Sequence, residues 1–253
     1  MRQQTLGTIS SSNTTAAADT LDALLNMFES GEDGCILDMT AGTHFQDTGK
    51  TTVAEDGDPV RVWADRSGLG NDFVSDTDGE RPVLSSTGAL HLTMLGDMFR
   101  GPSAPWGNWP QVSLFAGFQS GANGDAVLGA PHNNVSHQSP FFRWGIFTTS
   151  GVKVEGRFNG IAAASNTLTY NVAPQCIGAV PNNGAWYADG AVNRSIGMNN
   201  PISYINSVEV RIGENGGSGE NFSGDLYFVF LINRALSLTE IELVNTHCQT
   251  FFP

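Results

Sequence analysis

Residues 60–73, VRVWADRSGLGNDF, gather oxygen-bearing side chains within a few positions. Asp65, Asn71 and Asp72 offer carboxylate and amide oxygens, which calcium takes as ligands. The segment lacks the alternating acidic pattern and the terminal glutamate of a calcium loop, so we predict no bound cofactor and keep calcium as the alternative. Ser67 offers a hydroxyl, but no histidine stands near it in the sequence to activate it.

A turn explains the same residues better. Trp63 would pack inward while Asp65 and Ser67 bond to loop amides. Gly68 and Gly70 would supply backbone conformations that other residues resist. We therefore interpret this segment as structural.

Other residues that might support catalysis are sparse. Glu155 and Glu209 are each alone on their predicted strands, whereas jelly-roll glycosidases need paired carboxylates in one cleft. His132 and His137 lie five apart in a proline-bounded loop, which does not match the metal-binding HExxH pattern. The glycine-rich residues 213–220 carry two glutamates and no lysine, so they would repel phosphate. We expect no enzymatic activity and name no catalytic residue; a polysaccharide depolymerase, either glycosidase or lyase, is the alternative.

The loop GPSAPWGNWP, residues 101–110, is the best candidate for binding. It places Trp106 and Trp109 three positions apart between prolines. An exposed indole ring suits the apolar face of a sugar, and Asn108 can bond to sugar hydroxyls. The alternative is that both rings fill the end of the domain core.

Composition narrows the class of protein. The 253 residues include 30 glycines and only 15% charged residues, which favours short strands and many turns. A net charge of −13 argues against nucleic-acid phosphates and anionic membranes as partners. No apolar run approaches the roughly 20 residues that span a bilayer, so we expect no membrane insertion. Cys35, Cys176 and Cys248 are odd in number and far apart, which indicates buried thiols made in a reducing cytoplasm.

The pattern of apolar residues predicts a helix followed by many strands. Leu21, Leu24, Leu25 and Phe28 form one helical stripe, which needs a partner surface, either the same domain or a neighbouring chain. About a dozen strands follow, at the spacing of a sandwich. We expect them at 59–65, 89–95, 111–118, 125–131, 141–149, 152–158, 166–172, 175–180, 185–192, 207–213 and 225–233.

The end of the chain carries the strongest local signals. Residues 225–233 are apolar on both faces, which indicates a central strand covered on both sides. Ser237 and Glu240 then form a capping box that begins a closing helix.

This C-terminal part resembles laminin-G-like, concanavalin A-like jelly rolls. The residues that carry the resemblance are Asp189-Gly190 in AWYADGAV, Ile212-Gly213, Phe222-Ser223-Gly224, Asn233-Arg234-Ala235-Leu236-Ser237 and Glu240-Ile241. They cover about 60 residues in the family's order. The resemblance implies the jelly-roll fold.

Residues 45–84 resemble a segment common in tailed-phage virion proteins. The matching positions are Phe45-Gln46-Asp47, Gly57-Asp58-Pro59-Val60, Trp63, Asp65, Ser67-Gly68, Gly70-Asn71 and Arg81-Pro82. The departure is GKTTVAED, where the family more often has a proline after its threonines. The resemblance implies a protein of the virion, such as a head fibre, spike, decoration or tail-associated protein.

Together these observations predict an all-β protein, a concanavalin A-like β-sandwich jelly roll with a short N-terminal helical segment and a short C-terminal helix. Residues 1–33 would form an attachment or oligomerisation segment, and residues 34–253 the jelly-roll domain. We expect a structural virion protein made in the host bacterial cytoplasm, a homo-oligomer that binds other virion proteins through residues 1–33. Its lectin-like domain would contact host-surface glycan; a purely architectural decoration protein is the other alternative.

Overall fold

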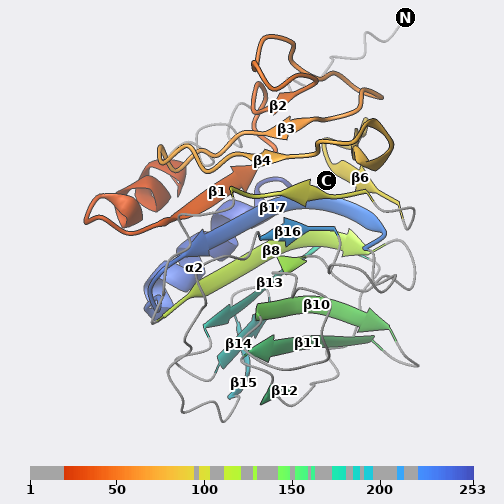
Figure 1. Cartoon of the computed structure of the whole chain (residues 1–253). Coiled ribbons are helices and arrows are strands. Elements are labelled where there is room, and N and C mark those ends of the chain that lie inside the picture. Colours follow the sequence, from red (N-terminus) through yellow and green to blue (C-terminus); the bar gives the residue numbers. More distant parts are fainter. Residues whose placement is uncertain are drawn as a thin grey trace, which may run out of the picture.

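The structure is a computed structural model of the chain, and its strands form two antiparallel sheets packed face to face (Figure 1). It describes residues 20–93, 97–102, 111–120, 128–129, 142–148, 152–158, 161–162, 173–180, 185–188, 191–195, 210–213 and 222–253. Short helices lie near both ends of this part of the chain. The predicted all-β, concanavalin A-like sandwich is confirmed.

Sheet A is built around the most apolar strand of the chain. From edge to edge it holds β15 (Ala191–Ser195), β14 (Ala185–Ala188), β13 (Gln175–Val180), β8 (Ser113–Ser120), β17 (Gly224–Ile232), β6 (Leu90–Leu92) and β5 (Val83–Leu84). Off this path, β1 (Gly34–Asp38) pairs with β17 beyond the end of β6. The first and last described strands are therefore hydrogen-bonded to each other.

Sheet B is longer and has many short strands. Its order is β12 (Ile161–Ala162), β11 (Val152–Phe158), β10 (Phe142–Thr148), β9 (Leu128–Gly129), β16 (Arg211–Ile212), β7 (Phe99–Arg100), β4 (Phe73–Val74), β3 (Val62–Trp63) and β2 (His44–Phe45). A 3-10 helix, η2 (Asp78–Glu80), lies between β4 and β5. Trp63, Phe73, Phe99 and Ile212 face sheet A and are fully buried in the core between the sheets.

The strand β17 is central and buried on both faces, as predicted. Its register with β8 shifts between Leu226 and Phe228. Leu226 therefore joins Val229 and Leu231 in the inter-sheet core, while Phe228 and Phe230 lie on the outer side of sheet A. Strict alternation would have placed Leu226 with Phe228, and the irregularity explains the difference.

Helices cover the outer side of sheet A. The N-terminal helix (residues 20–25), η1 (Asn26–Phe28) and α2 (Leu238–Gln249) all contribute to one apolar cluster there. The Phe28 ring meets the Phe230 ring edge-on at 5.8 Å between centroids. Gly117 allows α2 to approach β8, because a Cβ at that position would lie 2.3 Å from Cys248 Sγ.

This packing uses the apolar stripe that the sequence pointed out in residues 21–28. Leu24 is fully buried, so the helix packs on its own domain, which was one of the two interpretations left open. The boundary at residue 33 and the attachment role of residues 1–33 remain predictions, since the contact does not test what else this segment binds.

Some of the predicted strands are confirmed, one lies outside the described residues, and β1 was not predicted. The strands 152–158 and 175–180 coincide with β11 and β13, and the capping box of Ser237 and Glu240 is present at α2. The strand predicted at 166–172 lies outside the described residues. The sequence did not single out β1, whose five residues are all buried and so show no alternation of polar and apolar types.

Two further expectations concern the chain as a whole. Cys35, Cys176 and Cys248 are buried free thiols, as predicted. Burial, followed by the nearby Asp65 and Asp33 carboxylates, raises the pKa of Cys35 well above its ordinary value. In the part of the chain that the structure describes, no helix has the length and apolar character needed to cross a bilayer.

Candidate functional site

The segment 64–72 covers the edge of β1 that faces away from β17. The Ile36 amide donates to Asp65 Oδ1 at 2.9 Å, and the Ile36 carbonyl accepts from the Arg66 amide at 2.8 Å. Asn71 Nδ2 donates to the Gly34 carbonyl at 2.7 Å. These contacts satisfy backbone groups that an open sheet edge would leave unpaired.

Asp65 organises this segment. Its Oδ1 also accepts from the Ser67 amide at 2.8 Å, and its Oδ2 accepts from Ser67 Oγ at 2.6 Å and from the Asn71 amide at 3.0 Å. Gly68 and Gly70 have φ values of 86° and 76°, which favour glycine. The interpretation of the segment as a turn is confirmed.

The three candidate calcium ligands are thus placed close together, but each already has protein partners. Asp72 Oδ1 accepts from the Asp65 amide at 2.9 Å, and its Oδ2 forms an ion pair with Lys50. Asn71 uses its Nδ2 as a donor toward Gly34 and Asp33. Among the described residues, no group of three or more His, Cys, Asp or Glu is arranged to hold a metal ion. Calcium binding here stays the alternative that the sequence left open.

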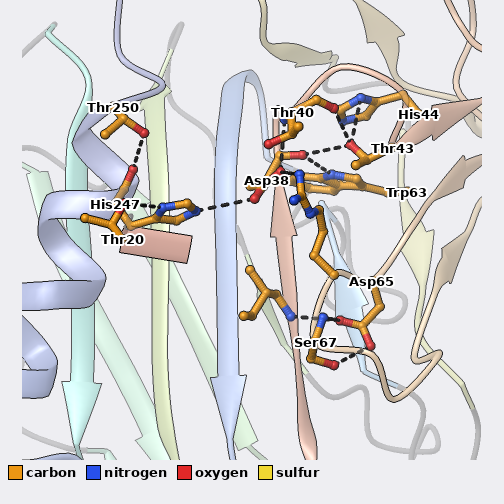
Figure 2. A network of polar contacts seen from close by, with 12 residues as sticks. Thr20, Asp38, Thr40, Thr43, His44, Trp63, Asp65, Ser67, His247 and Thr250 are labelled. Atoms are coloured by element: carbon orange, nitrogen blue, oxygen red, sulfur yellow. Dashed lines mark hydrogen bonds and ion pairs between the residues drawn. The ribbon is translucent and has the colours of Figure 1, made fainter. Parts of the chain in front are cut away.

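A second polar network lies under α2, on the outer side of sheet A (Figure 2). Asp38, at the end of β1, is fully buried, and its Oδ2 lies 3.3 Å from His247 Nε2. His247 Nδ1 lies 2.9 Å from Thr20 Oγ1. Asp38 Oδ1 accepts from the Thr40 amide at 2.9 Å and lies 3.6 Å from Arg66 Nη1.

These contacts decide the charge of Asp38. Burial by itself would raise the pKa of this carboxyl. The hydrogen bond with His247, the nearby Arg66 guanidinium and the bonds with Thr40 outweigh burial, so the pKa of Asp38 lies below 3.8. Asp38 is therefore an ionised carboxylate at neutral pH inside the fold.

A hydroxyl, an imidazole and a carboxylate in this order can also activate a nucleophile. Here the imidazole of His247 is 1% exposed and meets the rings of Phe228 and Phe251 edge-on at 5.6 and 5.2 Å between centroids. The arrangement ties the N-terminal helix, β1 and α2 together. We assign it a structural role.

His44 is another buried titratable group near Asp38. Burial lowers the pKa of His44 from 6.5 to about 4, and the Asp38 charge offsets only part of this effect. Its Nδ1 lies 3.2 Å from Thr43 Oγ1, and its Nε2 is buried without a hydrogen-bond partner among the described residues. His44 is therefore neutral at pH 7.

Sequence reasoning missed Asp38, His44 and His247. The available signals were weak: a carboxylate at the end of an apolar run, and a histidine three residues after Val244 on the apolar side of a helix. The predicted sugar-binding residues Trp106, Asn108 and Trp109 lie outside the described residues. So do His132, His137 and Glu209.

Sheet A and sheet B differ in what covers their outer faces. The N-terminal helix and α2 both pack on sheet A. In the described part of the chain, no helix joins a comparable apolar cluster on the outer face of sheet B.

No protein-family model and no curated protein sequence matches the chain. Solved structures do. Trypanosoma rangeli sialidase matches with a TM-score of 0.57 at 14% identity, over 95% of this chain and 39% of the enzyme. The same sialidase in complex with sialic acid gives a TM-score of 0.56 at 14% identity, with coverage of 95% and 39%. Ruminococcus gnavus IT-sialidase CBM40 covers 55% of this chain and 84% of its own at 16% identity, but its TM-score of 0.45 is too low to support an argument.

At such low identity these matches establish the fold alone. The chain spans about two fifths of the length of the sialidases, 39%, so their whole activity does not transfer to it. The concanavalin A-like part of the resemblance is confirmed, while the virion part stays a prediction.

The expectation of a protein without enzymatic activity is contradicted, because the structural neighbours are sialidases. The sequence argument searched for acids paired along one strand. Catalytic groups need to be close only in space, and the Asp38–His247 contact shows that this fold joins side chains 209 positions apart. A search by sequence spacing therefore had little power to exclude an active site.

Proposed function

We propose that this chain is a carbohydrate-binding β-sandwich that recognises glycans on a cell surface. The observation that carries the proposal is the fold, which matches a sialidase over 95% of the chain. The matched structures include that sialidase with bound sialic acid. The outer face of sheet B, on which no helix of the described residues packs, and the sequence-predicted loop with Trp106 and Trp109 are the two surfaces offered for binding.

The test is direct binding by calorimetry or on a glycan array. The full chain should bind a sialylated oligosaccharide such as sialyllactose more tightly than lactose, which lacks the sialic acid. Failure to bind any glycan on a broad array would refute the proposal.

Trp109→Ala tests the loop as the sugar platform. The variant should lose glycan binding while its melting temperature stays near that of the parent protein, because an exposed ring contributes little to the core. A sharp fall in melting temperature would place the ring in the core and remove it from the site.

Glycoside hydrolysis is the second candidate function, since the structural neighbours are sialidases. Incubation with a fluorogenic sialoside should be run beside the binding assay. Release of the fluorophore above the level of a boiled control would establish the activity in this chain.

We further propose display on a phage or phage-like particle, with residues 1–33 as the attachment segment and a homo-oligomeric state. The support is the resemblance of residues 45–84 to tailed-phage virion proteins. A mass-spectrometric inventory of purified particles tests this directly, and absence of the chain from them would refute it.

A further inference from the structure

One row of directly opposed residues crosses four neighbouring strands of sheet A. Each residue of the row is the register partner of the next. The row passes from Val83 on β5 to His91 on β6, Asp225 on β17 and Gln119 on β8. Directly opposed residues lie on the same face of a sheet. These four residues, the Asp225 row, therefore share one face.

That face is the outer one. The neighbouring row packs in or against the core between the sheets and consists of Leu84, Leu90, Leu226 and Phe118. Successive residues of a strand alternate between faces, so the Asp225 row points outward. The side chains of His91 and Asp225 are 51% and 24% exposed, and Val83 is 37% exposed. The helices that cover the phenylalanines of β17 therefore do not bury this part of sheet A.

Asp225 holds the His91 imidazole in place. His91 Nδ1 lies 2.8 Å from Asp225 Oδ1. When Nδ1 carries the proton and donates it to the carboxylate, Nε2 is an acceptor. A carboxylate has room for further hydrogen bonds as well. The pair can therefore accept hydrogen bonds from the hydroxyl groups of a ligand.

A buried phenol lies near this pair. The register irregularity of β17 falls at Tyr227 and places it in the outer apolar cluster, where its ring meets the Phe252 ring edge-on at 5.5 Å between centroids. Among the described residues, no hydrogen bond of ordinary geometry reaches the Tyr227 hydroxyl. Burial and then the Asp225 carboxylate raise the pKa of Tyr227, and the Thr87 hydroxyl offsets part of the rise. Tyr227 therefore keeps its proton at neutral pH and can donate it to an oxygen.

The chemistry of this surface suits a neutral sugar. Sugar hydroxyls both donate and accept, so they match a carboxylate, an imidazole and the hydroxyls of Ser85 and Thr87, whose oxygens lie 2.6 Å apart between β5 and β6. Val83 adds an exposed apolar side chain opposite His91, which suits the C–H groups of a sugar ring. An acidic ligand fits less well, because Asp225 and the net charge of −13 repel it.

We propose that the Asp225 row, together with Tyr227, binds the neutral hexose units of a glycan. The inference rests on the proposed glycan-binding function and adds a site separate from the two surfaces offered above. Asp225 and His91 accept hydrogen bonds from neighbouring hydroxyls of one sugar. Tyr227 donates to an oxygen of the same sugar after a small shift of the side chains that cover it. The three strand spacings from β5 to β8 span roughly 14 Å, which is enough for more than one sugar ring.

The test is calorimetric binding of lactose and sialyllactose to the full chain and to Asp225→Asn. The variant should bind both sugars at least about tenfold more weakly, because a charge-assisted hydrogen bond is lost. The ratio of the two affinities should stay the same, since the row binds the neutral units that both ligands share. The melting temperature should stay near that of the parent protein, because a partly exposed ion pair contributes little to folding.

The matched control is Asp76→Asn, which removes the same charge at an exposed position between β4 and η2. It should bind both sugars as tightly as the parent protein. Tyr227→Phe removes only the buried hydroxyl. This variant should bind lactose several-fold more weakly, with a melting temperature that is unchanged or higher, because an unpaired buried hydroxyl has been removed.

Parent-like binding of lactose by Asp225→Asn would overturn the proposal, and so would equal losses in Asp225→Asn and the control. Binding of sialyllactose but not of lactose by the parent protein would also overturn it. The same holds if Asp225→Asn loses affinity for sialyllactose alone, because the row would then bind the acidic sugar. In each of these results the parent protein still binds a glycan, so the proposed function stands. If the parent protein binds no glycan, the proposed function fails and this inference fails with it.

Discussion

Sheet A and sheet B share one apolar core, but their outer faces carry different types of residue. The outer face of sheet A carries Phe115, Phe228 and Phe230, and helices from both ends of the described chain bury them. On sheet B, the partly exposed Arg100 and Arg211 stand opposite each other on the face turned away from the core. Among the described residues the helices cover this aromatic part of the outer face of sheet A, so substitutions there should affect folding most.

Substitutions on the two outer faces should therefore have different effects. Side chains under the helices should be expensive to shorten, because their removal leaves cavities in a closed cluster. Side chains on the outer face of sheet B should affect binding more than folding.

Phe228→Ala should have the largest effect on stability. Phe228 is fully buried beneath α2, so the substitution should lower the free energy of unfolding by about 3–5 kcal/mol. Chemical denaturation measures the change, with Val53→Ala, at a 48% exposed position, as the control. A loss below about 1 kcal/mol would show that the covered face is not part of the folding core.

Leu24→Ala tests whether the N-terminal helix belongs to the covered face. Leu24 is fully buried against sheet A, and we expect a loss of about 2–5 kcal/mol in the same assay. Asp22→Ala, on the exposed side of the helix, should change little. If Leu24→Ala behaves like the control, the helix is a separable attachment segment and the domain boundary predicted at residue 33 gains support.

His44 should make stability depend on pH. Its folded pKa of about 4 lies below the unfolded value of 6.5, so the unfolded chain binds the proton more readily. The contribution of neutral His44 is complete above pH 6.5 and is lost as the pH falls to about 4, a difference of about 3 kcal/mol.

His44→Phe should remove this part of the pH dependence. The comparison is the free energy of unfolding at pH 7 and pH 4.5 for the parent protein and the variant. His91→Phe is the control, because the His91 side chain is 51% exposed. Parallel curves for the parent protein and His44→Phe would contradict the assignment of a buried neutral imidazole.

Ser237→Ala should have a smaller effect, about 1 kcal/mol, because it removes the cap of the helix that covers sheet A. Thr246→Ala removes an exposed hydroxyl from the same helix and should cost less. Thermal denaturation of the two variants compares them. Equal shifts would mean that the capping box does not stabilise α2.

Arg100→Gln should have the smallest effect on folding. Its ion pair with Glu80 is partly exposed, and such pairs contribute about 0–1 kcal/mol. A loss above about 2 kcal/mol would mean that the outer face of sheet B is as important for folding as the face under the helices.

The sequence predicted much of the fold through local chemistry. Ser237 and Glu240 marked the start of α2 because a capping box involves residues only three positions apart. Residues 225–233 marked the central strand because both of its faces are apolar. Asp65, Gly68 and Gly70 marked a turn because their hydrogen bonds and φ values are also set within a few residues.

Only the tertiary structure decided which distant residues meet. The contact of Asp38 with His247 and the pairing of Arg100 with Arg211 depend on strand order and register, which no short segment contains. The register shift in β17 likewise moved Leu226 to the inter-sheet core, because one irregularity reverses the faces that alternation assigns. Local hydrogen bonds and apolar patterns are properties of neighbouring residues, whereas a site assembled across a sheet exists only once the chain has folded.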